Sequence, residues 1–244
     1  GTCGRKVVEV RVFSWAPFFC SPRQLRPRGD GKGTRFLKTK AKSIEVHQGD
    51  LPAGLSFADG AAVDTETQGL KLGRDRLCLV QVSSGDGTCH LVQFPQAEYD
   101  APNLKAVLTD PGIIKIFHFA RFDLAAIGKY LEIDCQPVYC TKVASRLART
   151  YTDRHGLKDV CKELLGVELS KDQQSSDWAA ETLTGEQIEY AAADVLYLHG
   201  LRQKLDEMLV REGRQDLAEA CFGFLKTLAE LDNAGWRDDD IFSH

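Results

Sequence analysis

The amino-acid sequence predicts an α/β fold in which a mixed β-sheet is flanked by helices and the C-terminal half is helical. Three observations support this prediction. Short apolar runs separated by turn residues come first, a buried run followed by a helical pattern lies in the middle, and helical spacing continues from Thr141 almost to the end. This order, with strands first, then a strand–helix crossover and then helices, is typical of an α/β domain with a mixed sheet.

Four strands are expected in the first part of the folded region. Residues 44–47 alternate apolar and polar side chains, as a half-buried strand does. Residues 61–66, 77–82 and 89–94 are further strand-like runs, and the last two are joined by residues 83–87, whose serine, glycine and aspartate favour a turn. We expect these three runs to form an antiparallel meander.

A strand–helix crossover and a helical half follow. Residues 103–108 have helical spacing and end before an Asp-Pro-Gly turn. Residues 113–117 predict a buried strand, and residues 120–130 predict the helix after it. The last long helical stretches are expected at 185–210 and about 212–233.

Composition and charge divide the chain into two parts. The 244 residues are 43% hydrophobic and 27% charged, with a formal net charge of −4, which fits one globular domain. Residues 1–42 hold eleven Lys or Arg and two acids, so the rest of the chain carries 20 basic and 33 acidic residues. We expect residues 1–42 to be a basic, disordered segment and residues 43–244 to be a single domain.

The basic segment has several interpretations. An Arg-rich, acid-poor stretch is typical of a transit peptide and of an RNA-binding arm, but a mobile tail without a specific role is favoured. Residues 29–34 resemble a phosphate-binding loop only faintly, since its spacing and following helix are missing, and no nucleotide cofactor is expected. No apolar run approaches the roughly 20 residues of a membrane helix, so no membrane association is expected.

The eight cysteines indicate an intracellular protein. No two of them form a C-x-x-C pair, which argues against a zinc ribbon. Several lie inside apolar runs such as residues 77–80, which is typical of reduced, buried thiols. We therefore expect a cytoplasmic protein.

Two carboxylates lie close together in the second expected strand. Asp64 and Glu66 are two residues apart, so both project from one face, while Val63 and Thr65 project from the other. In a buried strand two such acids repel each other and lose hydration, which a divalent cation such as Mg²⁺ offsets. Taken alone, the pair also fits an exposed strand end with two solvated acids.

Two further motifs each carry an acid. Residues 118–123 lie where a buried strand ends and a helix begins, which is where ligands bind in α/β sheets. Asp123 falls in the first helical turns, where acids also occur because of the helix dipole. Tyr190 and Asp194 are four residues apart on a helix and share one face, which also fits a packed tyrosine and a rim acid.

Together, the three motifs are much more specific. D-x-E on a strand, an acid after a strand end and Y-x-x-x-D on a late helix resemble the motifs of the Tyr-bearing DnaQ-like 3′→5′ exonucleases. Residues 64–70 and 75–81 resemble the first motif of ribonuclease D and the strand after it. Residues 156–160 and 171–178 resemble that family's segments between its second and third motifs. The resemblance covers about residues 43–242, as a nuclease domain only.

The resemblance implies a ribonuclease H-like fold and a 3′→5′ exoribonuclease that shortens RNA from a free 3′ end. Such an enzyme releases nucleoside 5′-monophosphates by a two-metal mechanism with Mg²⁺ or Mn²⁺. The acids would hold the two cations, and the tyrosine would orient the attacking water, since a phenol with a pKa near 10 is a poor base at neutral pH. The catalytic residues so implied are Asp64, Glu66, Asp123, Tyr190 and Asp194.

The resemblance also implies contacts with the 3′ end of the substrate. Thr65 and Thr67 would supply hydrogen bonds, and Leu70 would wedge against the terminal base. His118 would contact a phosphate, for which a structural role is the favoured alternative, and Trp178 would stack on a base, for which a core anchor is an equally supported alternative. The residues are Thr65, Thr67, Leu70, His118, Gln174 and Trp178. A basic path for the phosphate backbone is expected from Lys142, Arg146, Arg149 and Arg154.

Three alternatives stay open on the sequence alone. One is a DNA exonuclease of the same superfamily, because no residue is identified that reads the 2′-hydroxyl. Another is a catalytically inactive nucleic-acid-binding module, against which the complete set of four acids and a tyrosine argues. The third is a phosphodiesterase that cleaves dinucleotides. The sequence predicts no oligomeric state.

Overall fold

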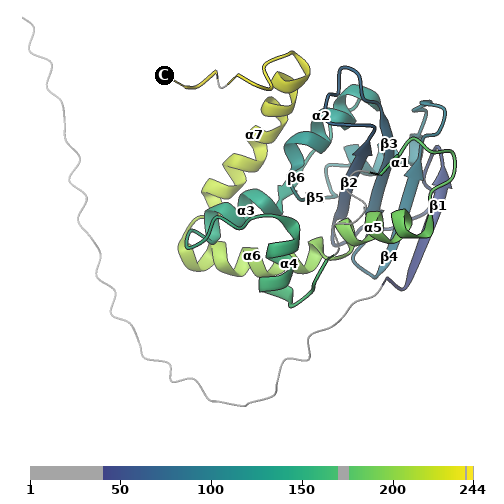
Figure 1. Cartoon of the computed structure of the whole chain (residues 1–244). Helices are drawn as coiled ribbons and strands as arrows, with labels where there is room; N and C mark the ends of the chain where they lie inside the picture. Colours follow the sequence, from purple (N-terminus) through teal and green to yellow (C-terminus); the bar gives the residue numbers. More distant parts are fainter. Residues whose placement is uncertain (1–40, 170–175, 240, 244) are drawn as a thin grey trace, which may run out of the picture. The chain divides into compact units, whose positions relative to one another are not determined.

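A six-stranded mixed β-sheet forms the centre of the fold (Figure 1). The computed structural model describes residues 41–169, 176–239 and 241–243, so the predicted basic segment lies almost wholly outside the described residues. The strand order is β1-β4-β3-β2-β5-β6, which confirms the predicted fold class. The strands are β1 (Ser43–Gln48), β2 (Ala61–Thr67), β3 (Leu77–Ser83), β4 (Thr88–Gln93), β5 (Lys115–Phe117) and β6 (Val138–Cys140).

The pairing of the strands makes the sheet mixed. Strands β2, β3 and β4 pair antiparallel, which confirms the predicted meander. Strand β1 adds parallel to β4, and β5 and β6 add parallel on the other side of β2. Every residue of β3 is buried, because helices cover both faces at the middle of the sheet.

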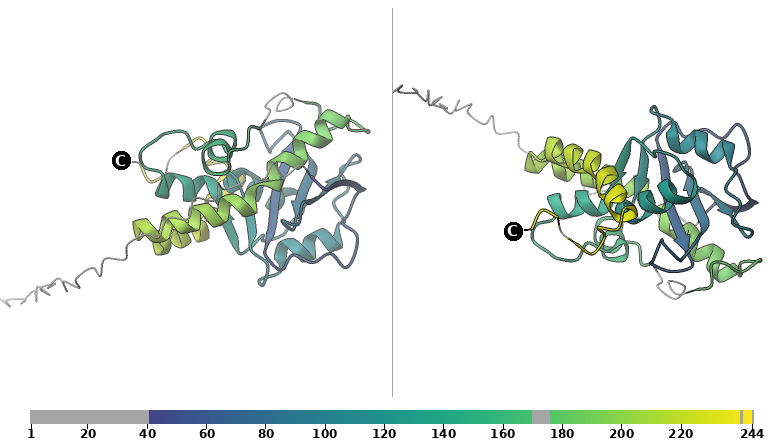
Figure 2. Two further views of the ribbon diagram at one scale, coloured as in Figure 1. Left: turned by 90° about the horizontal axis from the view of Figure 1, so that it is seen from below. Right: turned by 90° about the horizontal axis from the view of Figure 1, so that it is seen from above.

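Seven helices in the described part of the chain surround the sheet. Helix α5 lies against β2, β3 and β4, and α1 lies on the opposite face (Figure 2). Helices α3 and α6 pack against each other, and α7 packs against α2 and α3. The helices are α1 (Pro102–Thr109), α2 (Ala120–Tyr130), α3 (Thr141–Ala148), α4 (Leu157–Leu165), α5 (Gly185–Leu196), α6 (Leu198–Glu212) and α7 (Gln215–Asn233).

Two elements differ from the prediction. Strand β6 is only three residues long, too short for its pattern to be recognised, and it was not predicted. The prediction of one continuous helix over residues 185–210 was wrong, because α5 ends before Tyr197 and α6 begins after it. The buried residues Val195, Leu198 and Leu201 keep a helical spacing across this break, so periodicity does not reveal it.

The apolar side chains of the central strands and of the helices form one core. Cys78, Cys89, Cys135, Cys140 and Cys161 belong to it, and their thiols are free and buried, as predicted. Among the described residues, no helix is long and apolar enough to cross a membrane.

Candidate active site

Three carboxylates meet where α5 lies over β2. Asp64 and Glu66 project from one face of β2, and Asp194 comes from α5. One carboxylate oxygen from each lies within 4.8 Å of the other two. A capping box fixes the start of α5, because Thr184 Oγ1 accepts from the Gln187 backbone N–H at 3.2 Å and Gln187 Oε1 accepts from the Thr184 N–H at 2.9 Å.

A fourth carboxylate, that of Asp123, reaches the group from the first turn of α2. It is 3% exposed, and its Oδ1 accepts a 2.7 Å hydrogen bond from Thr65 Oγ1. Thr65 stands between Asp64 and Glu66, so this bond ties Asp123 to the strand that carries them. Helix α2 begins after Phe119, whose φ of 74° lies in the left-handed region. Such backbone strain in a non-glycine residue gathers at functional sites.

Burial raises the pKa of all four carboxyls. For Asp64, burial is the largest cause, and the charges of Asp123, Asp194 and Glu66 add to it. Burial also raises the pKa of Glu66 well above its ordinary value, and the pKa of Asp123 and of Asp194 to about 7. A positive charge among these oxygens would stabilise their ionised forms, and hard divalent cations prefer such ligands. The donor set therefore fits divalent metal ions.

Tyr190 lies one helical turn before Asp194 and lines the same pocket. Burial and the neighbouring carboxylates raise the pKa of its phenol, so the hydroxyl stays protonated at neutral pH. Its ring lies beside that of Trp178, with centroids 6.1 Å apart. A protonated phenol is able to orient a water molecule by hydrogen bonding but is not a general base.

A pocket of about 350 Å³ opens over the acids. It is lined by Leu70, by His118 at the end of β5, by Lys142 of α3 and by the start of α4 at residues 156–159. Lys142 Nζ lies 3.9 Å from the centre of the exposed Phe119 ring. The pocket therefore combines half-buried acids with cationic and apolar side chains at its edge.

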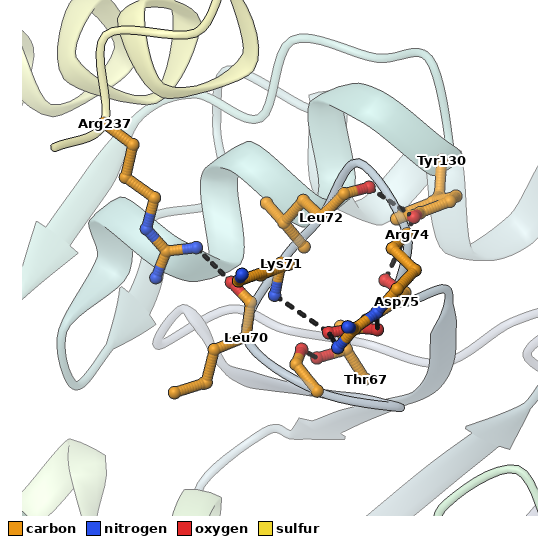
Figure 3. Close-up of polar contacts among 9 residues, drawn as sticks. Thr67, Leu70, Lys71, Leu72, Arg74, Asp75, Tyr130 and Arg237 are labelled. Carbon is orange, nitrogen blue, oxygen red and sulfur yellow. Dashed lines mark hydrogen bonds and ion pairs between the residues drawn. The ribbon is translucent and has the colours of Figure 1, made fainter.

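A hydrogen-bonded loop after β2 fixes the backbone beside Leu70 (Figure 3). The Tyr130 hydroxyl donates to the carbonyl of Leu72 at 2.7 Å and to that of Asp75 at 3.0 Å. Arg237, which follows α7, donates to the carbonyl of Leu70. Leu70 is nevertheless 71% exposed, so its side chain faces solvent while its backbone is fixed by hydrogen bonds.

The Asp75 carboxylate organises this loop from within. Its Oδ2 accepts from the backbone N–H of Lys71 at 3.0 Å, and its Oδ1 accepts from Arg74 Nε at 2.5 Å (Figure 3). A Cβ atom on Gly69 would lie 2.4 Å from Asp75 Oδ2, so a side chain at this position would displace the carboxylate. Thr67 Oγ1 donates to the Gly69 carbonyl at 2.5 Å and completes the loop.

The predicted substrate contacts are only partly gathered at the pocket. Thr65, Leu70 and His118 line it, whereas the Thr67 hydroxyl is engaged within its own loop. Nδ1 of His118 lies 2.8 Å from the hydroxyl oxygen of Thr141. Burial lowers the pKa of His118 to about 3, so its ring does not offer a positive charge to a phosphate. Gln174 lies outside the described residues.

Two predicted contacts are not offered by this structure. Trp178 is 2% exposed, so of its two predicted roles the structure favours the core anchor, and its ring has no free face on which a base could stack. Arg149 has a fully buried side chain and an ion pair with Glu163 at 2.5 Å, so it does not belong to a solvent-facing basic path. Arg146 and Arg154 are exposed, but they do not line the pocket.

Lys158 lines the pocket but was not predicted from the sequence to contact a substrate. It lines the pocket beside Asp159, from the first turn of α4. The stretch 156–160 was recognised as similar to ribonuclease D, but nothing in its residue types alone assigned a role to this lysine. Its position relative to the acids depends on the packing of α4, which the local sequence does not reveal.

Comparisons with known proteins agree with this fold. A family model described as a 3′-5′ exonuclease matches residues 53–210. Ribonuclease D of Gluconacetobacter diazotrophicus is 35% identical over 155 residues, which are 64% of this chain and 39% of that protein. The crystal structure of Escherichia coli ribonuclease D is 27% identical with a TM-score of 0.64, covering 74% of this chain and 48% of that one. The chain thus spans about two fifths of the length of the first curated relatives that it matches.

A further group of solved structures is more similar. Brucella melitensis NrnC is 56% identical with a TM-score of 0.80, and the match covers 83% of this chain and 98% of that one. Other structures of that protein are described as bound to pGG and with bound Mg²⁺.

The fold and the site together define a nuclease of the DnaQ-like superfamily. The chain belongs to the 3′-5′ exonuclease family and, by its identity over nearly the whole of NrnC, to the same family as that protein. The resemblance to ribonuclease D is thereby confirmed.

Proposed function

We propose that residues 43–244 form a single metal-dependent 3′→5′ exoribonuclease domain that acts in the cytoplasm, hydrolyses RNA from its 3′ end and releases nucleoside 5′-monophosphates. The observation that carries this proposal is the gathering of the Asp64, Glu66 and Asp194 carboxyls beside Tyr190, with Asp123 held next to them by Thr65. The pKa of each of these four carboxyls is raised. A structural role does not require four acids to be brought close together and withdrawn from water, whereas the binding of cations and a phosphodiester does.

The four acids divide between two cations, Mg²⁺ or Mn²⁺, in this proposal. Asp64, Glu66 and Asp194 would hold one, and Asp64 with Asp123 would hold the other. When bound, the cations supply positive charge to the attacking and leaving oxygens of the phosphodiester. Tyr190, whose phenol stays protonated, orients the attacking water rather than removing its proton.

The edge of the pocket supports a role in holding the 3′ end. Lys142 and Lys158 line the pocket and balance the charge of a phosphodiester near the acids. Leu70 offers an exposed apolar side chain on a held backbone, which suits contact with a terminal base. The Thr65 backbone lies beside the acids on β2, where it can hydrogen-bond the terminal nucleotide.

RNA is favoured over DNA by the relatives named ribonuclease D and by NrnC with bound pGG. The name pGG denotes a dinucleotide, so this neighbour also supports very short RNA as the substrate. A phosphodiesterase that acts on dinucleotides is therefore the second candidate. The two functions share the same acids, so only the preferred length of the substrate separates them.

The test is a gel assay with 5′-labelled single-stranded RNA of several lengths down to a dinucleotide. Each RNA has a free 3′-hydroxyl and is incubated with Mg²⁺, with Mn²⁺ or with EDTA, beside DNA of matched sequence. We expect shortening from the 3′ end that EDTA and Asp64→Asn abolish and that Glu219→Gln, a change of an exposed acid on α7, leaves intact. Cleavage of dinucleotides alone would favour the second candidate. Intact RNA and DNA at every length, with both metals, would contradict the proposed activity.

A further inference from the structure

A second group of metal-binding side chains lies on the edge strand β1 and its neighbour β4. Glu45 and His47 are two residues apart on β1 and project from the same face. His90 of β4 is paired with Glu45 in the parallel register of the two strands. We call Glu45, His47 and His90 the β1–β4 histidine cluster.

This cluster is separate from the active site. Asp64 pairs with Gln81 and Gln81 pairs with Leu91, so these three side chains share one face of the sheet. His90 is next to Leu91 and therefore projects from the opposite face. Strand β4 is also two strands away from β2. The four acids on and near β2 cannot share a cation with the β1–β4 histidine cluster.

Three potential ligand atoms converge in the cluster. Nε2 of His47 lies 3.1 Å from Nδ1 of His90. Oε2 of Glu45 lies 3.8 Å from Nε2 of His47 and 3.5 Å from Nδ1 of His90. The point in their plane that is equally far from all three atoms lies about 2.0 Å from each, which is the length of a bond from zinc to imidazole nitrogen or carboxylate oxygen. The triangle formed by these three atoms therefore already has the size of a zinc coordination shell.

A hydrogen bond between the two imidazoles does not explain the whole arrangement. In such a pair only one of the two facing nitrogens carries a proton, and the other presents a lone pair. The Glu45 carboxylate faces both nitrogens, so it faces that lone pair too. A metal ion would be attracted to lone pairs of all three groups and would account for their convergence.

We propose that the β1–β4 histidine cluster binds a divalent transition-metal ion of the zinc type. Two imidazoles and one carboxylate suit Zn²⁺ better than Mg²⁺, which prefers oxygen ligands. The side chains of His90, His47 and Glu45 are 8%, 20% and 49% exposed, so the site is anchored in the sheet and opens to solvent. A water molecule completes the coordination.

The bound ion fastens the edge strand to the sheet. The same pair of strands is joined on either side of the cluster by a hydrogen bond from Ser43 to Thr88 at 3.2 Å and by one from Gln48 to Gln93 at 3.1 Å. Both are weak neutral contacts between side chains, whereas metal ligation fixes three groups at once. The proposed role is therefore structural and does not depend on the nuclease activity.

The test measures Zn²⁺ and Co²⁺ binding to the full chain without an affinity tag. The double substitution Asp64→Asn and Asp194→Asn serves as the background, so that the acidic site does not retain the metal. We expect one Zn²⁺ per chain, and with Co²⁺ the intense visible absorption of a four-coordinate site with nitrogen ligands. His47→Ala, at a partly exposed position, should abolish both signals. Gln48→Ala removes the adjacent contact between the same strands and should leave both unchanged.

Thermal unfolding gives a second readout. Added Zn²⁺ should raise the Tm of the background protein and of its Gln48→Ala variant, but not that of His47→Ala or Glu45→Gln. The proposal is overturned if the background protein shows no four-coordinate Co²⁺ spectrum, or if that spectrum survives His47→Ala. Either result would leave the two histidines as a hydrogen-bonded pair.

Discussion

Thr65 Oγ1 donates a 2.7 Å hydrogen bond to Asp123 Oδ1 and so joins the centre of β2 to the first turn of α2. Because Asp64 and Glu66 flank Thr65, a single strand segment positions three of the four carboxyls. The same hydrogen bond lowers the pKa of Asp123 against the larger effect of burial, which raises it to about 7. Thr65 therefore affects both the position and the charge of Asp123.

Thr65→Val removes this hydrogen bond while keeping the shape of the side chain. Asp123 should then hold its proton to higher pH, because the bond that favours the carboxylate is lost. We expect the Mg²⁺ concentration for half-maximal activity at pH 7 to rise at least about tenfold, since one lost hydrogen bond to a charged group costs roughly 1.5–3 kcal/mol. Metal titrations of the activity measure this effect. Thr65→Ser keeps the hydroxyl and should stay near the wild type, and an equal loss in both variants would contradict the role of the bond.

The four carboxyls predict a pH dependence of stability in metal-free protein. The folded-state pKa of Asp123 and of Asp194 is about 7, above the ordinary value near 4. Such groups contribute most to stability below about pH 4, and this contribution is lost as the pH rises through about 7. Asp64→Asn relieves part of the repulsion, so it should raise the Tm of metal-free protein at pH 8 by about 3–8 °C.

Calorimetry on chelator-treated protein at pH 5 and pH 8 checks this expectation. Glu219→Gln removes an exposed acid and is the control for net charge, with little expected change. Saturating Mg²⁺ should reverse the order, because the wild type gains binding free energy that Asp64→Asn loses. A Tm for Asp64→Asn below the wild type in the absence of metal would show that the acids are not in mutual repulsion.

Two glycines of the loop after β2 offer a matched pair of substitutions. Gly69→Ala places a Cβ atom 2.4 Å from Asp75 Oδ2, whereas a Cβ atom on Gly73 would meet nothing within 4 Å. Gly69→Ala should therefore displace the Asp75 carboxylate and the backbone beside Leu70. We expect kcat/KM on short RNA to fall at least about tenfold, which corresponds to roughly 1.4 kcal/mol. Gly73→Ala should stay within about twofold of the wild type, and equal effects of the two changes would rule out this role of the loop.

Tyr190→Phe keeps the ring that lies beside Trp178 and removes only the hydroxyl. If the hydroxyl orients the attacking water, kcat should fall by about 10²-fold or more while KM changes little. Single-turnover kinetics over pH 6–9 provide the measurement. Because the phenol pKa is raised, the wild type should show no activity limb from deprotonation of Tyr190 within this range. A fall in stability with unchanged kcat would show a packing role instead.

Much of the fold was predictable because its patterns are local. The meander of β2, β3 and β4 follows from three consecutive strand-like runs, and α2 was predicted with its observed bounds. The break at Tyr197 was not predictable, since the buried face of α5 continues into α6 without a change of spacing. Tertiary packing decides that break.

The four acids and Tyr190 were predicted as one site because their order along the chain is a recognisable pattern. The surroundings of the acids were harder to predict. Trp178 and Arg149 belong to residue types that often contact nucleic acids, but here one is packed in the core and the other is paired with Glu163. Residue type and spacing do not distinguish a solvent-facing cation from a buried one. That distinction depends on which helices pack together.

The position of Asp194 on α5, late in the chain, has a consequence for synthesis. Strand β2, with Asp64 and Glu66, leaves the ribosome long before α5, and α5 reaches the sheet only after its own residues have emerged. The long-range contacts of such a fold form after the intervening chain is available. A nascent or truncated chain that lacks α5 therefore has an incomplete set of acids. The proposed nuclease would therefore lack a complete set of metal ligands until α5 has packed against the sheet.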